Sequence, residues 1–137
     1  VLRQALMHNS KTPREAQAEG RSANNAITQS WGMLTNRAVI DFEQHLSAKP
    51  SYVSKVLICN VIHDAIYILI KKEPAVIKWV NETLIKCMQW NDIIDIKSTD
   101  VPMEAELEIG KDLSNQIPVP NNASYDTIKG LLNDIAY

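Results

Sequence analysis

The sequence predicts an α+β domain in which helices cover one face of a small antiparallel sheet. Three patterns support this prediction: a long segment with apolar residues at helical spacing, an apolar segment rich in β-branched residues, and a segment in which apolar and acidic residues alternate. The composition agrees with one globular domain, because 45% of the 137 residues are hydrophobic, 22% are charged and the formal net charge is −2. A disordered chain would have fewer apolar residues and a larger net charge.

The first predicted helix runs from Ser22 to about Leu46. Its apolar residues recur at the spacing of one helix face that packs into a core; they are Ile27, Trp31, Leu34, Ala38 and Phe42. Residues 1–20 before it are polar and turn-rich, and we expect a connection with short helical pieces there. Because the chain begins with Val1 and has no leader pattern, we expect a piece of a longer protein or a processed product.

The segment from Val56 to Ile70 is apolar on both faces and rich in β-branched residues, which predicts a pair of buried strands. A second helix is predicted to begin at Pro74, because proline fits the first turn of a helix, and to end near Asn91. One face of this helix is apolar and consists of Ile77, Val80, Leu84, Cys87 and Met88.

Residues 101–109 alternate between apolar side chains and three glutamates, Glu104, Glu106 and Glu108. This pattern predicts a strand with one wet face, on which the glutamates are ordinary solvent-facing charges. The prolines and asparagines of residues 115–124 predict a loop. A last helix is expected to start with Ser124 as its N-cap and to bury Ile128, Leu131, Leu132 and Ile135. The predicted sheet therefore consists of a β-hairpin and this C-terminal strand.

The same sequence argues against several classes of protein. No transmembrane helix is expected, because the longest apolar run is interrupted by Asn60, His63 and Asp64. Cys59 and Cys87 are far apart and lack the spacing of metal ligands, so we expect reduced thiols and a cytoplasmic location. The near-neutral charge argues against a free-standing nucleic-acid-binding protein.

The dipeptide His63-Asp64 interrupts the apolar run, and a purely structural domain does not need it. A carboxylate among apolar residues loses hydration worth several kcal/mol unless a cation or hydrogen-bond donors replace it. We therefore expect the pair at the tip of the hairpin, where the carboxylate can meet water, metal or phosphate. On spacing alone, Asp64 is explained equally well as a simple turn residue and as a functional carboxylate.

Three other uses of this region have weaker support. His8, His45 and His63 lack the paired spacing of zinc ligands. The histidine-aspartate phosphohydrolases carry their dipeptide on a helix, whereas it lies here in β-type sequence. Cys59 is a poor candidate for a nucleophile beside His63, because four residues of extended strand keep the two groups apart.

A stripe of polar residues follows the first predicted helix. Arg21, Asn25 and Gln29 are four residues apart and form one ridge, which Gly32 and Asn36 continue. Most polar stripes are ordinary solvated faces. Here, however, the residues carry paired hydrogen-bonding groups, which suit contacts to phosphates and to minor-groove acceptors. Gly32 costs about 1 kcal/mol relative to alanine in a helix, which close approach of another surface would explain.

Taken together, these segments resemble the C-terminal palm of the family A DNA polymerases, the DNA polymerase I type. The polar stripe resembles the helix after the fingers, residues 60–65 (Asn-Val-Ile-His-Asp-Ala) resemble polymerase motif C, and residues 101–112 resemble the closing strand and glycine turn. The resemblance extends from about Arg14 to Leu113, in the family's order, and suggests a phage or a related replicon. It implies a connection from the fingers region (1–20), a palm portion (21–113) and a C-terminal loop and helix (114–137).

The resemblance implies template-directed nucleotidyl transfer. Asp64 corresponds to one of two metal-binding aspartates, and the Mg²⁺ ions of such a two-metal site bridge the attacking 3′-oxygen and the triphosphate. His63 would position the primer end, while Arg21, Asn25 and Gln29 would hold the duplex. The implied partners are primer–template DNA, deoxynucleoside triphosphates and the remaining polymerase segment or chain, with no membrane.

The sequence also departs from the family. The second catalytic aspartate and the nucleotide-gripping fingers helix have no counterpart here, so the chain alone is not expected to polymerise. Ala65 stands where the family usually has glutamate. The alternative is a non-catalytic interaction module, in which the palm-like fold is a scaffold, the site has decayed and the asparagine-rich C-terminal segment docks a partner.

Overall fold

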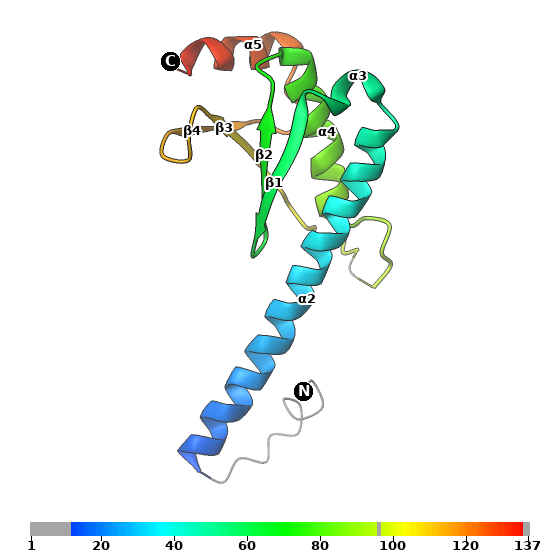
Figure 1. The fold of residues 1–137 in the computed structure, drawn as a ribbon. Coiled ribbons are helices and arrows are strands. Elements are labelled where there is room, and N and C mark those ends of the chain that lie inside the picture. The colour runs from blue at the N-terminus through cyan, green and yellow to red at the C-terminus, as the bar shows by residue number, and fades with distance from the viewer. Residues whose placement is uncertain (1–11, 96, 136–137) are drawn as a thin grey trace.

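The computed structural model describes residues 12–95 and 97–135. Within them the chain is α+β, as predicted, with helices and two small antiparallel sheets. The elements are labelled in Figure 1 and are, in chain order, α2 (Pro13–Ser47), α3 (Pro50–Val53), β1 (Val56–Ile62), β2 (Ala65–Ile70), α4 (Pro74–Gln89), β3 (Leu107–Gly110), β4 (Gln116–Val119) and α5 (Tyr125–Asp134). No described helix is both long and apolar enough to cross a membrane.

Helix α2 begins earlier than the sequence pattern predicts. Thr12 caps it, with its side-chain oxygen accepting a hydrogen bond from the backbone N–H of Glu15 at 3.2 Å, and Pro13 occupies the first turn. Residues 13–20 therefore belong to one long helix and not to short helical pieces, whereas residues 1–11 lie outside the described part. The capping threonine and the proline are start signals that outweigh the polar composition of this segment.

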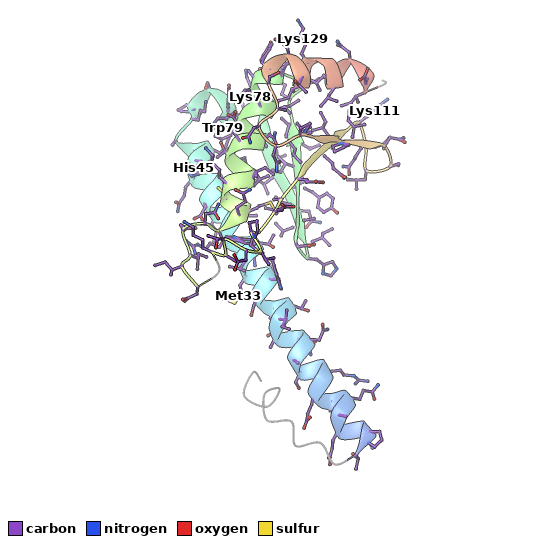
Figure 2. The ribbon with its side chains drawn as sticks, turned by 180° about the vertical axis from the view of Figure 1, so that it is seen from behind. Met33, His45, Lys78, Trp79, Lys111 and Lys129 are labelled. Atoms are coloured by element: carbon purple, nitrogen blue, oxygen red, sulfur yellow. The ribbon has the colours of Figure 1, made fainter. Side chains whose placement is uncertain are left out.

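Only the C-terminal half of α2 packs into a core. Ala38 and Phe42 are fully buried, but Ile27 is 58% exposed and Trp31 is 40% exposed, so the prediction that both face the core is wrong. Figure 1 shows the reason, because the N-terminal half of α2 extends away from the other described elements. In Figure 2, Met33 marks the level at which α2 leaves the body of the molecule.

Strands β1 and β2 form the predicted hairpin, with Ile62 paired to Ala65 at its closed end and a bulge between Ile58 and Asn60. Its core-facing side contributes the buried Val56 and the half-buried Ile58, Ile66, Ile68 and Ile70 to a cluster with α2 and α4. The opposite side is open: the paired residues Leu57 and Leu69 are 62% and 65% exposed. The prediction of two buried faces is therefore wrong, because the described helices cover one face of this sheet.

The C-terminal strand is shorter than predicted and pairs with a different partner. Residues 101–106 are not a strand, and β3 pairs with β4, which lies in the segment predicted as a loop. Pro118 lies in β4 opposite Glu108, and a two-stranded ribbon tolerates its missing N–H because both strands are edges. Gly110 is required at the turn, since a Cβ there would collide with the carbonyl oxygen of Asn115.

Helix α4 links two hydrophobic clusters, and its bounds agree with the prediction. One cluster joins α4 to α2 and β1 and contains Phe42, Leu46, Val56, Val76, Val80 and Leu84. The other joins α4 to the β3–β4 ribbon and α5 and contains Ile77, Ile109, Val119, Ala123, Ile128 and Leu132. Helix α5 is confirmed with its cap, because the Ser124 side chain accepts a hydrogen bond from the backbone N–H of Thr127 at 3.1 Å.

Candidate functional site

His63 and Asp64 form the two-residue turn between β1 and β2, and both side chains are exposed. The expected position at a hairpin tip is therefore confirmed. His63 has a φ of 55°, in the left-handed region that is costly for a residue with a Cβ. Non-glycine residues in this region gather at functional sites, where the surrounding structure holds the strain.

An open groove of about 570 Å³ separates this turn from the middle of α2. In Figure 1 the tip of the hairpin lies beside that part of the helix. The groove is lined from α2 by Thr28, Trp31, Gly32 and Asn36 and from the hairpin by Val61, His63 and Asp64. Two segments singled out by the sequence, about 30 residues apart in the chain, therefore line one groove.

The structure brings only the C-terminal end of the polar stripe to the groove. Gly32 and Asn36 line it. Gln29 is exposed next to the lining residue Thr28 but does not itself line the groove, whereas Arg21 and Asn25 are exposed on the part of α2 that extends beyond it. At 1.5 Å per residue, Arg21 lies about 17 Å along the helix axis from Gly32. The stripe thus starts at the hairpin tip and continues outward along a helix surface that no other described element covers (Figure 1).

Gly32 has open space in front of it. A Cβ built at this position meets no atom within 4 Å, so no described residue makes the close approach expected from the sequence. The missing side chain enlarges the groove instead.

Trp31 is the site residue that the sequence pattern assigned wrongly, because helical spacing alone placed it in the core. Its ring packs edge-on against Trp90, with 6.0 Å between ring centroids. Trp90 is 4% exposed, has a left-handed φ of 46° at the end of α4, and donates a hydrogen bond from Nε1 to the carbonyl oxygen of Leu34 at 3.0 Å. A buried tryptophan thus holds an exposed one at the groove.

Among the described residues that line the groove, Asp64 is the one that offers a carboxylate, the type of ligand that Mg²⁺ prefers. Residues 12–95 and 97–135 contain no group of three His, Cys, Asp or Glu side chains placed to hold a metal ion. The residues present therefore fit one ligand position and not a complete site. The thiol of Cys59 donates a hydrogen bond to the carbonyl oxygen of Leu57 at 3.4 Å. Burial raises the pKa of the Cys87 thiol, and this raised pKa disfavours Cys87 as a nucleophile.

Replacing His63 with glycine is expected to raise the free energy of unfolding by about 1 kcal/mol, because glycine adopts a positive φ without steric cost. Urea denaturation measures this change. His63→Ala is the matched control, since it removes the imidazole but keeps the Cβ and should give no gain. Equal effects of the two substitutions would show that the imidazole, not the backbone conformation, causes the change.

Comparisons of the chain with protein-family models, curated proteins and solved structures find no match.

Proposed function

We propose that this chain is the C-terminal palm portion of a family A DNA polymerase and contributes part of the site of template-directed nucleotide addition. One observation carries the proposal: the end of the polar stripe and the His63-Asp64 turn line the same groove. These are the segments that resemble the duplex-holding helix and motif C of the family. A structural turn would not need a groove shared with a polar helix face.

The exposed part of α2 supports a role in holding duplex DNA. Arg21 forms no ion pair with any residue in the described part of the chain, so its guanidinium is available for phosphate. Asn25 and Gln29 follow at successive turns and can hydrogen-bond to minor-groove acceptors, which all sequences present. Such contacts fix a duplex by its shape and not by its sequence.

Asp64 and His63 take the roles at the reacting end in this proposal. Asp64 provides one anionic oxygen for Mg²⁺, and the remaining ligands come from another segment or chain. The metal would supply charge stabilisation for phosphoryl transfer once that partner is present. His63, held at the tip by the backbone, would position the primer terminus.

The proposal is tested by recovering the assembled protein with a tagged copy of this chain from its native source. The recovered complex is expected to extend a primed template when Mg²⁺ and deoxynucleoside triphosphates are supplied, and to stop when the template is omitted. A recovered complex that never extends the primer would contradict the proposal.

Gln29→Ala is expected to weaken binding of this chain to a primer–template duplex about three- to tenfold, the effect of losing one or two hydrogen bonds. Fluorescence anisotropy of labelled DNA measures the affinity. Gln44→Ala is the matched control, because Gln44 is also exposed on α2 but lies fifteen residues beyond Gln29, on the far side of the groove. Equal affinities of the two variants would indicate that the stripe is an ordinary solvated face.

A non-catalytic scaffold is the second candidate function. It is favoured by Ala65 in place of the usual glutamate and by the lack of a metal-binding group among residues 12–95 and 97–135. In that case the tagged chain would recover a partner stably, and the recovered complex would not extend a primer.

A further inference from the structure

Trp31 combines exposure with a fixed position, which is uncommon for a large aromatic side chain. It is 40% exposed and forms a wall of the groove, while Trp90 packs against it edge-on at 6.0 Å. Trp90 is itself buried and tied to α2 through its hydrogen bond to Leu34. The indole of Trp31 is thus prepared to receive a flat ring at little cost in side-chain entropy.

The other groove residues define the chemistry of the occupant. Thr28 and Asn36 offer a hydroxyl and an amide, which can hydrogen-bond to the edge of a heterocycle. No lysine or arginine lines the groove, and Asp64 adds a negative charge, so a phosphate is disfavoured beside the indole. A neutral aromatic ring with polar edges fits these groups, and a nucleobase is such a ring.

We propose that Trp31 is a stacking platform for one nucleobase in the groove between α2 and the hairpin tip. The proposal rests on the proposed function for the kind of ligand, and it adds a positioning residue outside the resembling motifs. Gly32 makes the space for the base, since its missing side chain leaves nothing within 4 Å. Stacking tolerates every base, which suits a protein that holds DNA by shape.

Tryptophan fluorescence of this chain tests the platform directly, because a stacked base quenches the indole. A duplex with a recessed 3′ end is titrated first, followed by the same duplex with an abasic terminal nucleotide and by a free deoxynucleoside triphosphate. Quenching by the intact duplex but not by the abasic one would assign the base to the primer end. Quenching by the free nucleotide would assign it to the incoming substrate.

Two substitutions separate the platform from its surroundings. Trp31→Phe should remove most of the quenching. Trp79→Phe is the matched control, because Trp79 packs against Phe42 and does not line the groove, and it should retain the quenching. Gly32→Leu places its Cβ in open space. Its side chain should occupy the groove and weaken binding of the intact duplex about tenfold with little effect on the abasic one. Circular dichroism confirms that each variant is folded.

The result that overturns the proposal is quenching that is equal in wild type and Trp31→Phe, or absent with all three probes. Shielding of Trp31 from acrylamide in the free chain would also overturn it, because another part of the protein would then cover the indole. These outcomes are independent of the proposed function, which is judged by Mg²⁺-dependent extension in the recovered complex. Extension with an unquenched Trp31 would reject the platform alone.

Discussion

Asp64→Asn is expected to reduce Mg²⁺-dependent primer extension by the recovered complex at least about hundredfold. Asparagine keeps the size of the side chain but loses the anionic charge that a hard divalent cation requires, and metal stabilisation of phosphoryl transfer is worth several kcal/mol. The substitution should leave the fold intact, because Asp64 is exposed at a hairpin turn. Binding of the complex to primer–template DNA should be largely kept. Extension rates and DNA anisotropy, measured on the same preparation, separate the two effects.

Asp95→Asn is the matched control for this substitution. Asp95 is also an exposed aspartate in a turn, but it follows α4 and does not line the groove. Its replacement removes the same charge from the chain and should leave extension unchanged. Normal extension by the Asp64→Asn complex would exclude Asp64 as a metal ligand, and equal loss in both variants would indicate a general charge effect.

Phe42→Ala is expected to lower the free energy of unfolding by about 3–5 kcal/mol. Phe42 is 0% exposed and lies at the centre of the cluster that joins α2, β1 and α4, with its ring 5.7 Å from that of Trp79. Alanine leaves a cavity that its neighbours fill only in part. Since domains are stable by about 5–15 kcal/mol, urea denaturation should show a greatly lowered midpoint or a chain already unfolded.

Met33→Ala provides the comparison on the same helix. Met33 is 73% exposed, and it lies where α2 leaves the body of the molecule in Figure 2. Its removal should change the free energy of unfolding by no more than about 0.5 kcal/mol. Similar losses for Met33 and Phe42 would contradict the exposed position of Met33 and would mean that its side chain is packed against another part of the chain in solution.

Local signals in the sequence predict the elements that depend on them. Pro74 and Ser124 mark the starts of α4 and α5, and the apolar run broken by His63-Asp64 predicts the first hairpin with its turn. These features depend on residues close in the chain, so no knowledge of the tertiary structure is required. The residues that line the groove are predicted in part, because each of the two motifs can be recognised in the sequence alone.

The misjudged features depend on partners distant in sequence. The alternating pattern correctly predicts that β3 is a strand. It does not predict the partner, which is β4 with its Pro118 and not the first hairpin. The period of α2 gives the direction of Ile27 and Trp31 but not whether anything covers them. Trp90 could have been suspected only from its position just after α4, where a residue often takes the left-handed conformation.

The overhanging half of α2 has a consequence for the exchange of its backbone amides with solvent. No residue from Pro13 to Ser30 is buried among the described residues, so this part of the helix relies mainly on its own hydrogen bonds, whereas most helices in proteins owe their stability to packing. This segment can open locally while the core stays closed, which gives a gradient of deuterium uptake along one continuous helix. A ligand that binds along the polar stripe requires this segment to be helical. The cost of ordering the helix therefore reduces the binding free energy of that ligand. Affinity along the stripe is therefore set by the helicity of residues 13–30 as much as by the contacts themselves.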